Sequence, residues 1–232
     1  MNALIVFAKA PIPGRVKTRL TPPLSPGQAA ELYAAFAADS VAAARACGAA
    51  AVSVAYAPEP PFPDLNWLDE APNWRPQGPG DLGARLTAAF DAAFRGGARK
   101  VAIIGSDCPD LPSETLAEAF RRLDGPPAVL GPAVDGGYYL VGLREPRPDL
   151  FADMAWSDSG VLERTLARLR ASRTPFALLE RRADVDTFED LKALASRLSE
   201  PSGRAPRARE ALRRLFAADA TSREEPNWKT AP

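Results

Sequence analysis

The chain begins with a short apolar run that leads directly into a loop rich in glycine, proline and positive charge. The opening segment reads LIVFAKAPIPGRVKTRL, and the loop carries Lys9, Arg15, Lys17 and Arg19. A fully apolar run as short as Leu4–Phe7 is typical of a strand buried on both faces, as in the parallel sheets of α/β proteins. Ligands of open α/β sheets bind at the carboxyl ends of such strands. The start of the chain therefore predicts an α/β fold with a functional loop after its first strand.

The cations of this loop indicate an anionic ligand. The first acidic residue of the chain is Glu31, so no carboxylate accompanies them in the sequence. Backbone N–H groups and charged side chains of such a loop can form a concave site for phosphate oxygens, since charge-assisted hydrogen bonds are the stronger ones. A simple solvated loop is the alternative interpretation. The spacing matches neither a Walker P-loop nor the GxGxxG of a Rossmann dehydrogenase, so we expect a nucleotide site of another kind.

Composition excludes several kinds of chemistry and partner. The 29 basic and 29 acidic side chains cancel, which gives no electrostatic reason to expect nucleic acid or a membrane surface as a partner. Histidine is absent from the sequence, which excludes Ser-His-Asp and Cys-His hydrolases, histidine-bound zinc and histidine general bases. Cys47 and Cys108 are too few for a disulfide framework and too far apart for a CxxC motif, so we expect two packed thiols in a reducing cytosol.

The sequence also lacks the features of a secreted or membrane protein. Pro11 and Pro13 interrupt the first apolar run too early for a signal peptide, and an apolar run of 18 residues does not occur elsewhere. We expect a soluble, cytoplasmic protein that is a monomer or a homodimer.

The remaining pattern alternates strands and helices. We predict strands at 52–56, 101–105, 128–130, 138–143 and 176–179, and helices at 26–47, 82–94, 113–123, 161–169 and from Thr187 onward. The prolines at 58, 60, 61 and 63 mark an irregular connection. Only a short Gly-containing segment separates the strands at 128–130 and 138–143, so the sheet is expected to be mixed, with one antiparallel strand.

Length and composition favour one domain and a tail. We expect residues 1–200 to form a nucleotide-binding α/β domain and residues 201–232 to form a basic helix, around 208–216, with a flexible end.

Acidic residues follow two of the predicted strands. Asp107 comes directly after the strand at 101–105 and should lie at the same sheet edge as the cationic loop. A carboxylate beside phosphates fits a hard cation between them, because Mg²⁺ and Mn²⁺ take oxygen ligands from one or two carboxylates and from substrate phosphates. In the segment DVDT, Asp186 is a candidate second ligand, with Asp184 on the same side if the segment is extended. The alternative roles are structural caps: Asp107 or Asp110 could cap a turn or the helix near Ser113, and Asp186 or Thr187 could cap the last core helix.

The segment DGGYY is a third candidate. Its glycines, Gly136 and Gly137, permit either a tight hairpin turn or a close approach of backbone to ligand, and both interpretations stay open. Without histidine, a carboxylate such as Asp135 is the expected proton acceptor if the chemistry needs one. Tyr138 and Trp156 are candidates for stacking on a base or sugar, although most aromatic residues at such spacings belong to the core.

Five motifs, in the order AKAPIPGRVKTRL, GDLGARL, GSDCPDLP, DGGYYLVGL and DVDTFEDL, together resemble a known group. They resemble the bacterial GT-A-fold glycosyltransferases of the arsenosugar-biosynthesis type, which are related to molybdenum-cofactor and 2-phospholactate nucleotidylyltransferases. The resemblance covers nearly the whole predicted core. It implies a nucleotide-diphospho-sugar transferase fold, with three α/β/α layers and a mixed, mainly parallel sheet, and a nucleotide site that depends on Mg²⁺ or Mn²⁺.

The resemblance also implies roles for residues that match its motifs. The nucleotide would be bound by Lys9, Ala10, Pro11, Gly14, Arg15, Lys17, Arg19 and Gly83. The metal would be held by Asp107 and Asp186, and the catalytic residues would be Asp107, Lys17 and Asp135. The acceptor would contact Asp135, Gly136, Gly137, Tyr138, Trp156 and Ser157. The family commonly has Trp-Ser-Thr where this chain has Trp156-Ser157-Asp158, a difference that falls on the acceptor pocket.

Three functions follow from these observations. The first is a metal-dependent glycosyltransferase that uses a nucleotide-sugar donor and a small-molecule acceptor. The second is a nucleotidyltransferase that joins a nucleoside triphosphate to a phosphorylated small molecule and releases pyrophosphate, which the Gly-Arg-Val-Lys loop resembles more than it does a typical glycosyltransferase opening. The third is a non-catalytic nucleotide-binding protein, against which the intact Asp107 and Asp186 argue.

Overall fold

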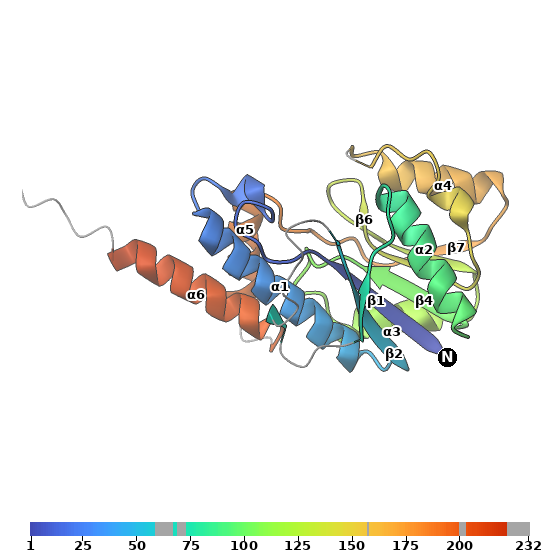
Figure 1. Cartoon of the computed structure of the whole chain (residues 1–232), viewed down its shortest axis with the longest axis horizontal. Helices are drawn as coiled ribbons and strands as arrows, with labels where there is room; N and C mark the ends of the chain where they lie inside the picture. Colours follow the sequence, from blue (N-terminus) through green and yellow to red (C-terminus); the bar gives the residue numbers. More distant parts are fainter. Residues whose placement is uncertain (59–66, 69–72, 157, 200–202, 222–232) are drawn as a thin grey trace, which may run out of the picture.

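The computed structural model describes residues 1–58, 67–68, 73–156, 158–199 and 203–221 (Figure 1). Within these residues one sheet has the strand order β3-β2-β1-β4-β6-β5-β7. Its strands are β1 (Asn2–Ala8), β2 (Ala51–Tyr56), β3 (Asn73–Pro76), β4 (Lys100–Ile104), β5 (Ala128–Pro132), β6 (Tyr138–Leu143) and β7 (Phe176–Leu178). β6 runs antiparallel to β4 and β5, and the other neighbouring strands pair in parallel. The predicted mixed, mainly parallel sheet is confirmed.

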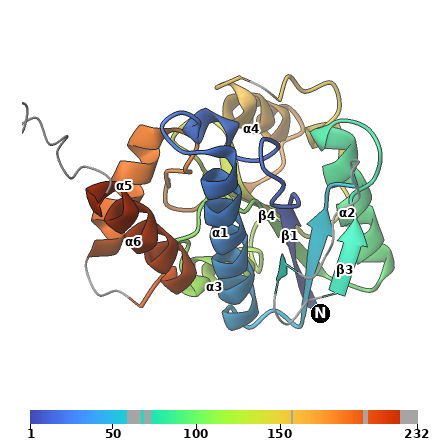
Figure 2. The same cartoon turned by 60° about the vertical axis from the view of Figure 1, so that its left-hand side comes forward.

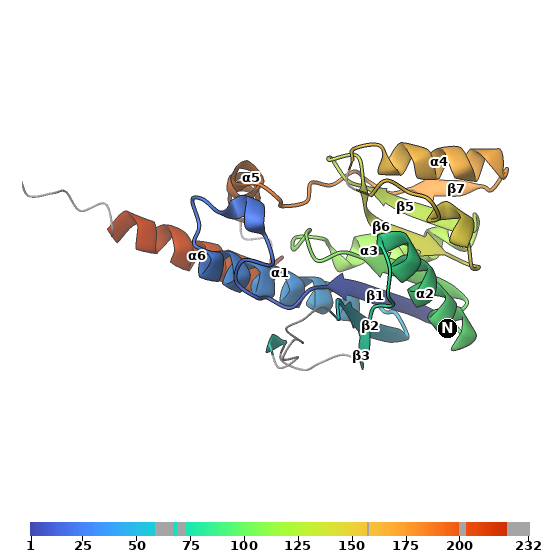
Figure 3. The same ribbon diagram turned by 45° about the horizontal axis from the view of Figure 1, so that its top comes forward.

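Helices cover both faces of this sheet (Figures 2 and 3). They are α1 (Pro26–Ala46), α2 (Leu82–Arg95), α3 (Ser113–Arg122), α4 (Val161–Ala171), α5 (Phe188–Ser199) and α6 (Pro206–Thr221), with 3₁₀ turns η1 (Thr18–Leu20) and η3 (Pro148–Leu150). α1 and α3 pack on one face, and α2 and α4 pack on the other. The chain therefore has the predicted three-layer α/β/α architecture.

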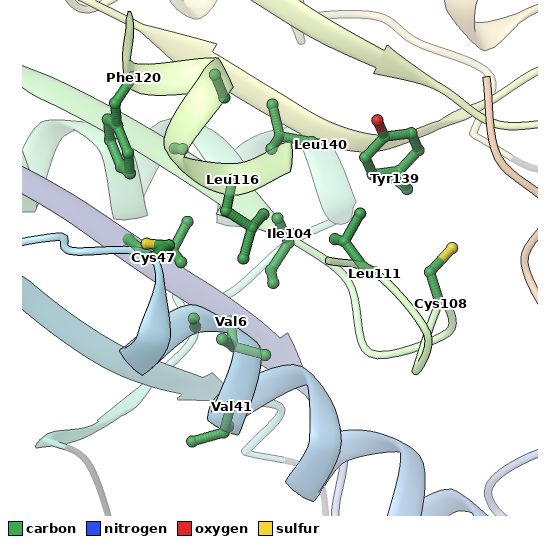
Figure 4. Close-up of a cluster of buried hydrophobic side chains, with 14 of the residues drawn as sticks. Val6, Val41, Cys47, Ile104, Cys108, Leu111, Leu116, Phe120, Tyr139 and Leu140 are labelled. Carbon is green, nitrogen blue, oxygen red and sulfur yellow. The ribbon is translucent and has the colours of Figure 1, made fainter. Parts of the chain in front are cut away.

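Alternating residues of β1 show why its sequence is apolar throughout. Leu4 and Val6 belong to the cluster under α1 and α3, whereas Ile5 belongs to the cluster under α2 and α4. A strand that is covered on both faces has no position for a polar side chain. In Figure 4, Val6 and Val41 lie on one side of Ile104 in the first of these clusters. The two cysteines are buried free thiols, as predicted.

Local hydrogen bonds fix the helix starts that the sequence predicts. Ser25 and Gln28 form a reciprocal capping box at α1, and Asp81 accepts the backbone N–H of Ala84 at 2.9 Å to cap α2. At α5, Thr187 Oγ1 accepts the N–H of Asp190 at 3.3 Å, while Asp190 Oδ2 accepts the N–H of Thr187 at 2.7 Å. This is a capping box with Asp in place of the usual Glu, and it starts the helix that the sequence predicts from Thr187 onward.

One strand is not predicted from the sequence. β3 reads NWRP, pairs only with β2 in the described sheet, and has no buried residue. A short polar edge strand lacks the apolar run that identifies a buried strand, and Pro76 is tolerated there because an edge strand has an unpaired side. α6 is also longer than the predicted helix at 208–216. Pro60, Pro61, Pro63, Ser157 and the predicted flexible end at 222–232 lie outside the described residues.

The last helix packs along α1, and a buried carboxylate holds its start (Figure 3). Asp39 in α1 accepts the backbone N–H groups of Arg207 at 3.2 Å and Ala208 at 2.8 Å. Burial raises the pKa of Asp39 above its usual value, although these two hydrogen bonds and the charge of Arg207 oppose the shift. Among the described residues, no helix has the length and apolar character needed to cross a bilayer.

Replacing Asp39 with alanine should lower the free energy of unfolding by about 1–3 kcal/mol at pH 7, because two N–H groups lose a buried acceptor. This cost should grow as the pH is lowered toward 4. The raised pKa means that the folded state binds the Asp39 proton more tightly than the unfolded chain does. Protonation of Asp39 therefore stabilises the wild type as the pH falls, and the alanine variant lacks this contribution. Urea unfolding at several pH values measures both effects, with Glu31→Ala, exposed on the same helix, as the control. A cost that shrinks at low pH would contradict this role.

Candidate active site

The carboxyl ends of β1, β4, β5 and β7 and the start of β6 lie at one edge of the sheet. A cavity of about 770 Å³ opens at this edge. Sites for small molecules commonly have volumes of about 300–1,000 Å³. Its wall is built from the loop after β1, the end of β4, the start of β6, the connection from β3 to α2, and the segment before α5. The convergence predicted for Asp107 and the cationic loop is therefore present.

The loop after β1 turns back through two residues with left-handed backbone. Gly14 has φ 77° and Lys17 has φ 47°. Glycine adopts this conformation readily, whereas a lysine does so at a cost of about 1–3 kcal/mol, which is typical of functional positions. The turn directs the Lys17 side chain inward, where it is only 4% exposed. Lys9, Arg15 and Arg19 are exposed and line the cavity.

The ammonium of Lys17 lies between two carboxylates. It contacts Asp107 Oδ1, lies 3.2 Å from Asp186 Oδ1 and donates a hydrogen bond of 2.5 Å to the carbonyl of Val185. Burial lowers the pKa of Lys17, but the two carboxylates outweigh it and hold the pKa above its usual value. Lys17 therefore stays charged, and its donors are directed to the protein.

Backbone contacts between two loops hold these carboxylates in place. The N–H of Val185 donates to the carbonyl of Asp107 at 3.0 Å, and Cys108 Sγ donates to the carbonyl of Ala183 at 3.5 Å. Because Thr187 and Asp190 form the cap of α5, the Asp186 carboxylate is left to face the cavity. The Asp107 and Asp186 side chains are 47% and 41% exposed, so both are open to a ligand.

The donor set suits one kind of metal. Among the described residues, no group of three or more His, Cys, Asp or Glu side chains could hold an ion. The two carboxylates at the cavity, Asp107 and Asp186, are hard oxygen donors. They fit Mg²⁺ or Mn²⁺, which commonly take one or two carboxylates and complete their shell with substrate phosphates and water. Metal binding at this site stays a prediction, and the two carboxylates are donors of the kind that Mg²⁺ and Mn²⁺ prefer.

A third carboxylate beside this pair has a raised pKa. Burial is the main cause that raises the pKa of Asp184 to about 6, and the charges of Asp135 and Asp186 add to the shift. The acidic side chains at this edge therefore repel one another. A cation at the edge would relieve that repulsion.

A buried tyrosine joins the two loops from below. Tyr33 of α1 accepts the backbone N–H of Lys9 at 2.7 Å, and its hydroxyl lies 2.9 Å from Ser106 Oγ. Burial and the charge of Asp107 raise the pKa of Tyr33 above its usual range, so the phenol stays neutral. Sequence reasoning missed this residue, because an aromatic side chain in an alanine-rich helix looks like ordinary core.

The opposite part of the cavity wall is apolar and aromatic. Tyr138 and Trp156 meet edge to face, with ring centroids 6.5 Å apart. Gly83 packs beneath them, since a Cβ there would lie 2.4 Å from the carbonyl of Phe151 and 3.1 Å from the Trp156 indole nitrogen. The absence of a side chain at Gly83 therefore allows the Trp156 indole to pack at this position.

In the turn between β5 and β6, the backbone of Gly136 packs closely against another segment of the chain. Gly136 has φ 93°, and a Cβ on it would lie 2.0 Å from the carbonyl oxygen of Ser159. The Leu162 N–H also donates to the Gly136 carbonyl at 2.9 Å. Asp135 is exposed and accepts the Gly137 N–H at 2.8 Å. This turn therefore anchors the segment that carries Trp156.

The structure brings some of the predicted site residues together and leaves others in the supporting loops. The cavity wall includes Lys9, Arg15, Lys17, Arg19, Asp107, Tyr138, Trp156 and Asp186. The described wall does not include Ala10, Pro11, Gly14, Gly83, Asp135, Gly136 or Gly137. Their predicted contacts with substrate, and that of Ser157, stay predictions. Besides Tyr33, the wall includes Gln77 and Arg85, which sequence reasoning missed although Arg85 belongs to the GDLGARL motif.

Comparison with solved structures shows the class of protein to which this fold belongs. A crystal structure from Desulfovibrio desulfuricans G20, of a protein assigned provisionally as a nucleotide-diphospho-sugar transferase, matches with a TM-score of 0.87 and 33% identity over 95% of this chain and 97% of that one. The chain thus has the fold of that transferase-like protein. It belongs to the bacterial family described as uncharacterized protein conserved in bacteria (DUF2064), whose model matches residues 40–158. No curated protein matched the sequence.

More distant solved structures share the fold. CMP:2-keto-3-deoxy-manno-octonic acid synthetase, complexed with CTP, matches with a TM-score of 0.55 and 12% identity over 85% of this chain and 98% of that one. A nucleotidyl transferase from Methanothermobacter thermautotroptrophicus matches with a TM-score of 0.52 and 18% identity over 85% of this chain and 97% of that one. These structural neighbours are transferases. The likeness to arsenosugar-type enzymes stays a prediction.

Replacing Tyr33 with phenylalanine should lower the free energy of unfolding by about 1–3 kcal/mol, since the Lys9 N–H and the buried Ser106 hydroxyl lose a partner. Urea unfolding measures the effect. Tyr56→Phe serves as the control, because Tyr56 packs edge to face on Trp74 and is half-buried. Equal losses in the two variants would show that the Tyr33 hydroxyl holds nothing in place.

Replacing Gly136 with alanine should destabilise the fold by about 1–3 kcal/mol more than the matched change Gly97→Ala. Gly97 has a similar φ of 86°, but a Cβ there meets nothing within 4 Å, so it reports only the cost of the backbone conformation. Thermal and urea unfolding of both variants give the comparison. Similar stabilities would mean that the Ser159 contact is easily relieved.

Proposed function

We propose that this protein is a metal-dependent glycosyltransferase that moves a sugar from a nucleoside diphosphate to a small-molecule acceptor. The observation that carries the proposal is the juxtaposition of two half-exposed carboxylates, Asp107 and Asp186, with the cationic loop at one end of a ligand-sized cavity. The provisional assignment of the Desulfovibrio protein, at 33% identity, supports this class of donor.

The cationic end of the cavity suits the diphosphate of the donor. Lys9, Arg15 and Arg19 line this end with exposed side chains that can donate charge-assisted hydrogen bonds to phosphate oxygens. Asp107 and Asp186 would hold Mg²⁺ or Mn²⁺. When bound, the ion would neutralise charge that builds on the leaving diphosphate, a contribution of several kcal/mol.

The aromatic end suits the sugar and the acceptor. Tyr138 and Trp156 together offer an apolar ring surface on the face of the sheet away from α1. Asp135 lies just before β6, is exposed, and is the candidate to orient or deprotonate an acceptor that enters from this side. A covalent nucleophile is not required for this chemistry.

Nucleotidyl transfer is the second candidate function. The exposed cations Lys9, Arg15 and Arg19 on the cavity wall favour it, because a nucleoside triphosphate carries more negative charge than a nucleotide sugar. The acceptor phosphate would attack the α-phosphorus, and pyrophosphate would leave toward these cations. In either reaction the chain's own contribution is to position the phosphates and compensate their charge.

Assays of product type distinguish the two functions. The protein is incubated with Mg²⁺ or Mn²⁺, a panel of acceptors, and either nucleotide sugars or nucleoside triphosphates. We expect release of nucleoside diphosphate from a nucleotide sugar, and a decrease in kcat of about 10²–10³-fold for Asp107→Asn and Asp186→Asn. Asp124→Asn, an exposed carboxylate paired with Lys100, is the control and should retain activity.

Pyrophosphate release from a triphosphate would instead establish the second function. If no nucleotide or nucleotide sugar raises the melting temperature with or without metal, both proposals are wrong, since a ligand of the native state must stabilise it.

A further inference from the structure

The Lys17 ammonium lies between the carboxylates of the two candidate metal ligands, Asp107 and Asp186. It contacts Asp107 and lies 3.2 Å from Asp186, and its third acceptor is the carbonyl of Val185 at 2.5 Å. The side chain is 4% exposed, so water does not replace these partners. An ion held by both carboxylates would therefore occupy the place where the Lys17 ammonium lies when no ligand is bound.

We propose that this site takes its divalent ion only together with nucleotide phosphates, because Lys17 competes with the ion for Asp107 and Asp186. The substrate would thus be the metal–nucleotide complex, and metal alone would bind weakly. This inference rests on the proposed function of the cavity as a nucleotide and metal site.

The balance of charge around the carboxylates supports the competition. Arg19 lies 3.5 Å from the second oxygen of Asp186, so the two carboxylates already have two cations beside them. Asp184 is a further carboxylate nearby, but the Lys17 ammonium between the two candidate ligands repels a lone divalent ion and weakens its binding there. Phosphate oxygens change this balance. They supply the negative charge that lets the ion bind Asp107 and Asp186 while the Lys17 ammonium moves to a phosphate.

The local structure keeps Lys17 at this point and leaves it able to move. Its backbone is left-handed, with φ 47° and ψ 39°, which directs the side chain inward. The loop therefore holds this conformation before a ligand binds. The ammonium sits at the end of a flexible four-carbon stem, so it can change partner without a change in the loop. Val185, whose N–H bonds to the carbonyl of Asp107, keeps the two ligand loops together when the lysine moves.

The experiment measures Mn²⁺ binding directly, without reference to activity. The free-ion EPR signal is titrated for the wild type, Lys17→Met and Lys9→Met, with and without ADP, CDP, GDP or UDP. Lys9→Met is the matched control, because it removes an equal charge from the same loop at an exposed position. We expect Lys17→Met to bind Mn²⁺ alone about tenfold or more tightly than the wild type, and Lys9→Met to change the affinity for Mn²⁺ alone by less than about threefold. Lys9→Met serves as a control only without nucleotide, because Lys9 is a proposed phosphate contact.

Stability gives a second readout of the same exchange. Removal of the ammonium leaves the two carboxylates facing each other, so Lys17→Met should melt at a lower temperature than the wild type. Mn²⁺ alone should restore that loss, while it should leave the wild type nearly unchanged. Circular dichroism verifies the fold. If Lys17→Met does not fold, Lys17→Gln, whose amide can still donate to the Val185 carbonyl, takes its place in both measurements.

Three outcomes would overturn the inference. If the wild type binds Mn²⁺ with a nucleotide but Lys17→Met binds Mn²⁺ alone no more tightly, the inference fails and the proposed function stands. If the wild type binds nucleotide equally well in EDTA and Lys17→Met loses that binding, Lys17 is the permanent cation of the site and takes the place of a metal. If the wild type binds no nucleotide with or without Mn²⁺, the proposed function itself fails.

Discussion

A sheet that is covered by helices on both faces leaves polar chemistry no place except the ends of its strands. Leu4, Ile5 and Val6 all face packed helices, so the first position at which β1 can present a charge is the loop beyond Ala8. β4 meets the same limit and presents Asp107 at the same edge. The site is thus a consequence of how the core is buried. Its cations and carboxylates come together because the parallel strands end together.

Much of the fold could be predicted from the sequence, because burial and capping are local patterns. The apolar strands, the helix starts at Pro26 and near Thr187, and a mixed sheet with one antiparallel strand are all confirmed. β3 has no such pattern and was missed. The site shows the same division: the sequence indicates that Lys17 and Asp107 belong to it, but a single sequence does not reveal that Lys17 bonds to a carbonyl 168 positions away.

Two carboxylates of the structure show how environment separates roles that a sequence cannot. Asp39 in α1 is 3% exposed and caps a helix, although it lies in an alanine-rich run that offers no sign of this. Asp186 is next to a helix start and looks like a cap, yet Thr187 and Asp190 perform that task. The cap thus frees Asp186 for the cavity. Which carboxylate serves packing and which faces the cavity is decided by its neighbours in three dimensions.

The reversal of β6 gives the cavity two walls of different origin. The cationic part of the wall is formed where β1 and β4 finish, whereas the aromatic part is formed where β6 begins, after the turn that holds Gly136 against Ser159. A change in the length or sequence of that turn would reposition Tyr138 and the segment that carries Trp156. Under the proposed function, such a change would alter the side of the cavity proposed for the acceptor and leave the loop proposed to bind the donor phosphates in place.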